Sequence, residues 1–272
     1  MINLIDITEE DVRIKLRSYL KDTSVGSEQW RILASALRLS DYFSFTENRT
    51  YPRPDHPDER KRKPLIYMLV AILISLRTTL ENEQKAVGNL ISKFPNAEDL
   101  FSADVKDIED CIQPAGMANK KSITIRKALD YVEGKFNGSL EALSLLDTED
   151  ARSEILKIPG VGPKSADCLL SIGLGKPSIA VDVNVFRVTS WLFAFLWSDN
   201  PNYNDENQII VVKRFLDTFV PKDDFLCQIV HTYFLLFGKS IGSKHPKNEP
   251  CLIHEYCMMC QKNNNFQLNL FK

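Results

Sequence analysis

The sequence lacks several features that would assign it to a class from composition alone. Its longest apolar run, LIYMLVAILISL over 65–76, is shorter than the roughly 20 residues of a membrane-spanning helix. Its formal net charge of -2 gives no global attraction to nucleic acid, so any phosphate contact must come from a local basic patch. The amino terminus, MINLIDITEEDVRIKL, is acidic early and carries no basic leader, so we expect an intracellular protein without a membrane span.

Strand-like alternation and internal repeats of fixed period are also missing. Apolar residues instead recur at helical spacing, and they predict two helices within 8–43 and a buried helix at 65–76. Further helices are expected near 139–146, 149–157, 163–173, 183–196 and 209–240. Between the first two sets, 44–63 is rich in proline and charge, which is typical of an exposed connection. With 272 residues and 44% hydrophobic content, the chain is predicted to be all-α with a substantial core.

The six cysteines fall into two groups. Cys111, Cys168 and Cys227 are scattered through apolar surroundings, and we expect them to be reduced core thiols rather than parts of a disulfide framework. The other three lie near the carboxyl terminus. His231, in an apolar segment, is expected to be a core residue rather than a metal ligand.

The stretch LKIPGVGPKSADCLL, residues 156–170, has the composition of two helices joined by a tight turn. The first helix should end at Ile158, the turn should contain Pro159, Gly160, Val161 and Gly162, and Pro163 should take the first position of the second helix. Glycine tolerates positive φ, and a proline at that position forfeits no hydrogen bond. Such a turn lets backbone amides approach a phosphate at the helix start, although the same turn also serves as a purely structural hairpin.

Two residues near this hairpin suggest chemistry. Lys164 follows the turn directly, and Asp182 follows the apolar segment IAV, where a helix should begin near Val183. Taken separately, the aspartate predicts a helix N-cap and the lysine a solvated surface charge. Together they provide an amine nucleophile and a carboxylate, a pair that can act at a sugar carbon.

The segment LKIPGVGPKSADCLLSIGLGKPSIAVDVNVFRV resembles the signature of the helix-hairpin-helix DNA glycosylases of the endonuclease III type. The resemblance extends from about Pro64 to Cys260, and neither the first 63 residues nor 198–208 have a counterpart in it. It implies a two-lobed all-α fold that binds duplex DNA in a cleft between the lobes. We therefore expect a helical extension and linker over 1–63, a glycosylase core of two interleaved helical lobes over 64–260, a tail over 261–272, and a monomer.

The resemblance also implies a mechanism. The damaged or mismatched nucleotide would be turned out of the duplex, and Lys164 would attack its C1′ and form a Schiff base that permits strand cleavage by β-elimination. Asp182 would help to deprotonate the amine and would stabilise positive charge on the sugar. This chemistry requires no cofactor. The alternatives are a monofunctional mismatch glycosylase and a non-catalytic helix-hairpin-helix DNA-binding protein.

Further DNA contacts follow from the same resemblance. The segment LISLRTTLENE places Arg77 and Thr78 where the family reaches into the gap left by the extruded base. Endonuclease III usually has glutamine at the position of Arg77, whereas thymine-mismatch glycosylases often carry arginine there, so the excised base is not identified. Asn119, Lys120 and Lys121 stand at an expected helix start, where they would contact phosphates or form a solvated basic face.

The carboxyl-terminal cysteines form an incomplete metal motif. Relatives of endonuclease III often end in C-x6-C-x2-C-x5-C, which ligates a four-iron four-sulfur cluster, whereas this chain has Cys251, Cys257 and Cys260. In one alignment with that motif, Lys244 and His254 take the places of two cysteines, and lysine is a poor substitute for a thiolate. Three outcomes are open: a tail without metal, an iron-sulfur cluster with an unusual fourth ligand, or a zinc site that includes His254.

Overall fold

A computed structural model describes residues 8–21, 26–43, 63–196, 201–242 and 251–263, and every regular element in these ranges is helical. The all-α prediction is therefore confirmed. The α-helices are α1 (Glu9–Leu20), α2 (Ser27–Leu39), α3 (Leu65–Ser75), α4 (Leu80–Lys93), α5 (Ala97–Ser102), α6 (Val105–Ile112), α7 (Ala118–Phe136), α8 (Thr148–Ile155), α9 (Pro163–Cys168), α10 (Val183–Leu192), α11 (Glu206–Phe219), α12 (Asp224–Ile241) and α13 (Met258–Asn263). Short 3-10 turns occur at η3 (Gln113–Ala115), η4 (Glu141–Leu145) and η6 (Ala194–Leu196), and a π-turn, η5 (Leu169–Gly173), continues α9. No helix in these ranges combines the length and apolar character that crossing a membrane requires.

The chain divides into two compact units that do not follow its linear order. The first consists of Met1–Asp6 with Arg49–Lys176, and the second of Ile7–Asn48 with Pro177–Lys272. Helices α3 to α9 belong to the first unit, and α1, α2 and α10 to α13 belong to the second. The predicted boundaries at 63 and 260 remain a prediction, and most of the expected connection 44–63 and of the tail 261–272 lies outside the described residues.

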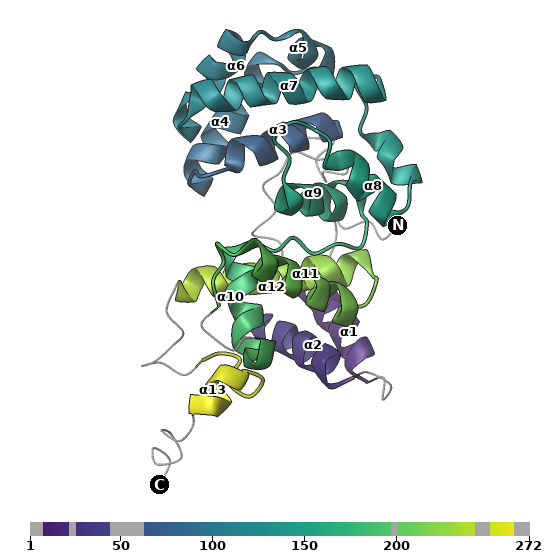
Figure 1. Cartoon of the computed structure of the whole chain (residues 1–272), viewed down its shortest axis with the longest axis vertical. Coiled ribbons are helices and arrows are strands. Elements are labelled where there is room, and N and C mark those ends of the chain that lie inside the picture. The colour runs from purple at the N-terminus through teal and green to yellow at the C-terminus, as the bar shows by residue number, and fades with distance from the viewer. Residues whose placement is uncertain (1–7, 22–25, 44–62, 197–200, 243–250, 264–272) are drawn as a thin grey trace. The chain divides into compact units, whose positions relative to one another are not determined.

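The first unit is organised around α3. All ten residues from Leu65 to Ile74 are buried, because the helix is apolar on every side and has no face suited to water. It packs against α4, α7 and α9 (Figure 1), and the hydroxyl of its one tyrosine, Tyr67, donates to the carbonyl of Phe94 at 2.7 Å. The prediction of a buried helix at 65–76 is confirmed.

Two predicted helix bounds differ from the structure. Helix α8 ends at Ile155 rather than Ile158, because the chain turns immediately and the amide of Lys157 donates to the carbonyl of Glu154. The single helical region expected over 209–240 is two helices, α11 and α12. Pro221 has no amide hydrogen to continue a helix, and Asp223 caps α12 by accepting a hydrogen bond from the amide of Leu226 at 2.9 Å.

The second unit is built on the pair α10 and α12, which pack against each other. They approach each other closely at Gly238 in α12. A Cβ atom placed on Gly238 would lie 2.6 Å from the Cβ of Asn184 and 2.9 Å from its Cα, a spacing that only a glycine permits. Asn184 is the second residue of α10, so this contact sets the position of the amino-terminal end of α10.

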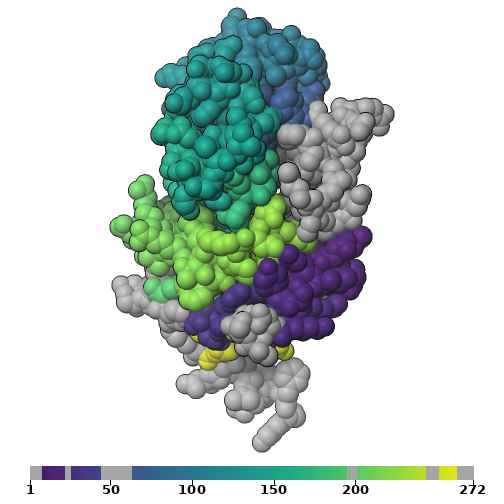
Figure 2. Space-filling view, turned by 90° about the vertical axis from the view of Figure 1, so that its right-hand side faces the viewer, coloured from purple at the N-terminus to yellow at the C-terminus, as the bar shows by residue number. Residues whose placement is uncertain are grey.

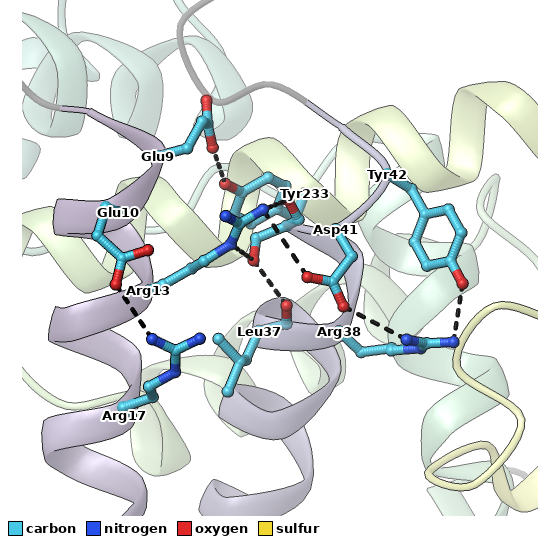
Figure 3. A network of polar contacts seen from close by, with 10 residues as sticks. Glu9, Glu10, Arg13, Arg17, Leu37, Arg38, Asp41, Tyr42 and Tyr233 are labelled. Atoms are coloured by element: carbon cyan, nitrogen blue, oxygen red, sulfur yellow. Dashed lines mark hydrogen bonds and ion pairs between the residues drawn. The ribbon is translucent and has the colours of Figure 1, made fainter.

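The amino-terminal helices α1 and α2 complete the second unit by packing on α12, and Figure 2 shows them (purple) directly against the yellow-green helices of this unit. The hydroxyl of Tyr233 in α12 donates to a carboxylate oxygen of Glu9 at 2.8 Å. Arg13 in α1 donates to the carbonyl of Ser40 after α2 at 2.7 Å. It also forms an ion pair with Asp41 at 3.8 Å (Figure 3). Polar contacts at the first residue and near the middle of α1 therefore fix it against partners distant in sequence.

Candidate active site

The expected hairpin between α8 and α9 is present, and its two glycines have different structural roles. Gly160 has φ +82°, and a Cβ atom there would lie 2.2 Å from Cγ2 of Thr124 in α7. Gly160 is therefore required by the fold, which seats the turn on α7. A Cβ atom on Gly162 would meet no atom within 4 Å, so the backbone at the start of α9 is open to approach from outside.

A salt bridge ties the two hairpin helices together. Nε of Arg152 in α8 donates to Oδ1 of Asp167 in α9 at 2.8 Å, and the aspartate side chain is 3% exposed. Hydrogen bonds between a guanidinium and a carboxylate are among the stronger ones in proteins. Lys164, the second residue of α9, is half-buried on this fixed frame.

Asp182 caps α10, as its sequence context predicts. Its Oδ1 accepts from the amides of Asn184 at 2.9 Å and Val185 at 2.8 Å, and its Oδ2 accepts from Nδ2 of Asn184 at 3.0 Å. The carboxylate is half-buried, and its orientation is fixed by the helix that it begins. Two residues earlier, the carbonyl of Ala180 lies 2.8 Å from Nδ1 of His231, which anchors the segment before the cap to α12.

Three of the residues expected to contact DNA from the first unit are exposed. Arg77, in the segment between α3 and α4, is exposed, and Thr78 beside it is half-buried. Asn119 and Lys120 are exposed in the first turn of α7, a helix whose amino-terminal end has no side-chain cap. Uncapped amides at a helix start have no partner within the helix and suit an anion.

The third basic residue of this group, Lys121, lies in a different environment from the one expected. It is 7% exposed, and its Nζ donates to the carbonyls of Ile74 at 2.8 Å and Ala115 at 2.9 Å. Burial lowers the pKa of its ammonium group. The interior position of Lys121 differs from the exposed phosphate contact that the sequence suggests.

A pocket of about 190 Å³ opens beside these residues. Its wall is apolar, from Leu73, Leu76 and Met117, and its rim carries the cations of Arg77 and Lys120. Sequence reasoning missed Met117, which is 50% exposed and has φ 51°. The signal available was its place directly after Gly116, in the turn before an expected helix.

The carboxyl-terminal cysteines converge. The sulfur atoms of Cys251, Cys257 and Cys260 all lie within 4.8 Å of one another, and the first two residues are buried. A hydrogen bond with Cys251 raises the pKa of the Cys260 thiol to about 12. Hydrogen bonds with Cys251 and Cys260 raise the pKa of the Cys257 thiol. The thiol of Cys257 also donates to the carbonyl of Trp191 at 3.4 Å. As expected, Cys111 is a buried free thiol.

Comparison with known proteins identifies the family. The sequence profile of the HhH-GPD superfamily of base excision DNA repair proteins matches residues 70–211, just over half of the chain. A candidate DNA glycosylase of Arabidopsis thaliana is 33% identical over 136 residues, which are 50% of this chain but only 46% of that protein's length. Endonuclease III of Bacillus subtilis is 26% identical over 196 residues, 72% of this chain and 81% of that one.

The fold agrees with these sequence matches. The solved structure of a trapped endonuclease III–DNA covalent intermediate has a TM-score of 0.63 and 22% identity to this chain, and it covers 95% of this chain and 99% of its own. The resemblance seen in the hairpin signature is thereby confirmed. The chain belongs to the HhH-GPD superfamily of base excision DNA repair proteins, the helix-hairpin-helix DNA glycosylases of the endonuclease III type.

Proposed function

We propose that the protein removes a damaged or mismatched base from duplex DNA and then cleaves the strand at the resulting abasic site. Lys164 is the nucleophile and Asp182 its carboxylate partner. The observation that carries the proposal is the placement of an amine directly after the open hairpin turn at Gly162, in a chain of this superfamily. The protein acts as a monomer, in the cellular compartment that contains the duplex DNA.

The reaction uses the neutral amine of Lys164. The target nucleotide leaves the stack, and the nitrogen lone pair attacks C1′ while the bond from C1′ to the base breaks. The base departs with the bonding electrons and takes up a proton. The sugar ring then opens to an iminium between Nζ and C1′. Loss of a proton from C2′ expels the 3′ phosphate oxygen, and water finally hydrolyses the imine and returns the free amine.

Asp182 supports this sequence electrostatically. An ordinary lysine amine is almost fully protonated at neutral pH, so Lys164 needs a proton acceptor to act as a nucleophile. A carboxylate also stabilises positive charge that develops on the sugar as the base leaves. Because the backbone amides of Asn184 and Val185 hold its oxygens, Asp182 needs no reorientation when charge develops. Since the two residues belong to different units, the proposal requires DNA to engage both.

Phosphate binding is assigned to two helix starts in the first unit. At the hairpin, the space around Gly162 allows a phosphate oxygen to reach the amides that begin α9. At α7, the exposed Asn119 and Lys120 stand beside an uncapped helix end. Backbone amides and an ammonium group bind phosphate without reading the base sequence, so these contacts serve lesions in any sequence context.

Borohydride trapping tests the catalytic assignment. The protein is incubated with duplexes that carry thymine glycol, 8-oxoguanine, uracil, thymine opposite guanine or an abasic site, and the Schiff base is reduced to a stable adduct. We expect an adduct with at least one duplex, and its loss in Lys164→Ala. Lys157→Ala is the matched control, because Lys157 is an exposed lysine of the same hairpin that pairs with Glu154 at 2.5 Å. No adduct on any duplex would contradict the proposal.

The two alternatives give different results in the same experiment. A monofunctional mismatch glycosylase, which Arg77 and Thr78 would suit, releases the base without forming an adduct. A non-catalytic DNA-binding protein does neither and only shifts the mobility of the duplex. Asp182→Asn separates catalysis from binding further: we expect turnover to fall by more than DNA affinity, and equal losses would refute the role given to Asp182.

We further infer that the cysteine cluster suits one metal ion better than a four-iron cluster. Around a single zinc ion with Zn–S bonds of about 2.3 Å, tetrahedral thiolates lie about 3.8 Å apart. A four-iron cluster spreads its thiolates over separate iron atoms, and so needs them farther apart. The spacing of Cys251, Cys257 and Cys260, within 4.8 Å, is closer to the first arrangement. Such an ion would fix the segment before α13 and would take no part in base removal.

A further inference from the structure

Lys121 occupies an unusual position for a lysine in a DNA-binding surface. It is 7% exposed, and its Nζ donates to two main-chain carbonyls, those of Ile74 at 2.8 Å and Ala115 at 2.9 Å. Burying a long cationic side chain is costly unless its hydrogens find acceptors. The two acceptors come from segments far from each other in sequence, so this one side chain joins them.

Each acceptor lies just before a short segment at the rim of the pocket. Ile74 is in the last turn of α3, two positions before the first rim loop, defined here as 76–79. Ala115 ends η3, directly before the second rim loop, defined as 116–117. Carbonyls at a helix end have no partner within the helix, and a cation there is favoured by the helix dipole. The ammonium group of Lys121 supplies a hydrogen-bond donor to both carbonyls and also supplies the positive charge.

Both rim loops contain strained backbone. Arg77 in the first has φ 54° and Met117 in the second has φ 51°, and they are two of the three non-glycine residues with positive φ in the described chain. A side chain in this region is held there only when the surrounding structure imposes it. The two residues line the same pocket, so both strained positions border one feature.

We propose that Lys121 is a positioning residue, which fastens the two rim loops to each other and so fixes the spacing of the Arg77 and Met117 side chains. The inference rests on the proposed function, in which this rim meets a duplex with one nucleotide turned out. An extruded nucleotide leaves a gap in the stack, and side chains that enter it must be placed in advance, because a displacement of about 1 Å can cost about 10²-fold in rate. Although Lys121 also lines the pocket, its Nζ is engaged by the two carbonyls, so it acts through the loops.

Hydrogen exchange of the DNA-free protein tests the fastening directly. In Lys121→Met, a side chain of similar length lacks both hydrogen bonds. We expect the amides of 75–79 and 113–121 to exchange at least about tenfold faster, which corresponds to the loss of hydrogen bonds from a charged donor. Lys120→Met is the matched control, since it removes the same charge one residue earlier on an exposed side chain. In this control both loops should exchange at the wild-type rate.

Kinetics on duplex substrate separate positioning from phosphate binding. For Lys121→Met we expect kcat to fall about 10- to 100-fold with little change in KM, and for Lys120→Met we expect mainly a rise in KM. Lys121→Arg, which retains donors for both carbonyls, should restore slow exchange and most of kcat. Amides of α8, elsewhere in the same unit, report whether a variant is folded. If Lys121→Met does not fold, Lys121→Gln replaces it, because the shorter glutamine side chain cannot span both carbonyls. We expect faster exchange in at least one loop of that variant.

The outcomes are distinct. Wild-type exchange in both loops of the folded Lys121→Met or Lys121→Gln variant would overturn the inference. So would equal acceleration by Lys120→Met. Faster exchange in a protein that never processes any duplex would leave the fastening intact and count against the proposed function instead.

Discussion

A methyl group added at Gly238 tests how the fold positions Asp182. The new Cβ would lie 2.6 Å from Cβ of Asn184 and 2.9 Å from its Cα and carbonyl oxygen. Two of these three atoms are backbone, so no side-chain rotation relieves the contact. The amino-terminal end of α10 must therefore move away from α12. Asp182 bonds the amide of Asn184 at 2.9 Å, so its carboxylate must move with that end.

Two terms oppose each other in the stability of Gly238→Ala. Overpacking a close contact costs about 1–3 kcal/mol, and alanine in place of glycine within a helix contributes about 1 kcal/mol in return. The free energy of unfolding should therefore fall by only about 0–2 kcal/mol. Turnover should fall far more, about 10- to 100-fold, because displacing a catalytic group by about 1 Å has an effect of that size.

Urea denaturation gives the first quantity, and single-turnover cleavage of a lesion-containing duplex gives the second. Gly134→Ala is the control, because Gly134 lies inside α7 and an added Cβ meets no atom within 4 Å. That variant should gain about 0.5–1 kcal/mol and keep wild-type turnover. Wild-type turnover in Gly238→Ala, together with a stability gain equal to that of the control, would refute the link between this helix contact and Asp182.

Other substitutions probe the hairpin and the cysteine cluster. Gly160→Ala should lower the free energy of unfolding by about 1–3 kcal/mol through strain and contact with α7. Gly162→Ala should leave stability nearly unchanged and should weaken DNA binding at several salt concentrations. Unchanged affinity in Gly162→Ala would exclude a phosphate at that turn. Asp167→Asn, which replaces a charge-assisted bond between the hairpin helices by a neutral one, should cost about 1–3 kcal/mol in urea denaturation. Elemental analysis should find about one zinc per chain, lost in Cys257→Ser and retained in Cys111→Ser, and the visible spectrum should lack the broad iron-sulfur absorbance. A metal-free wild-type protein, or an iron-sulfur spectrum, would contradict a single-ion site.

Features that depend on neighbours in sequence could be predicted from the residues alone. The apolar run 65–76 indicated a buried helix because it offers no polar face, and α3 is buried along its length. Asp182 was identifiable as an N-cap because a short polar residue directly precedes an apolar helix, and its hydrogen bonds confirm it. The break between α11 and α12 also had a local signal in Pro221, which the periodicity of the flanking helices obscured.

Features that depend on distant segments could not be predicted in this way. Lys120 and Lys121 are adjacent identical residues, yet the first is exposed and the second is 7% exposed. What distinguishes them is a carbonyl at Ile74, 47 positions away. In the same way, the sequence marked both hairpin glycines as turn residues, but only the approach of Thr124 shows that Gly160 alone is sterically required.

The second unit combines an early and a late part of the chain, so it cannot be completed until the late part has been synthesised. Glu9 and its hydrogen-bond partner Tyr233 are separated by 224 residues, and ribosomes add about 5–20 residues per second, so α1 leaves the ribosome roughly 10–45 s before α12. During that interval Val12 and Leu16, both fully buried in the finished unit, have no α12 to cover them. The first unit, nearly continuous in sequence, can fold in the meantime. A nascent chain stalled before α12 should thus bind chaperones through its first 43 residues while its hairpin already resists protease.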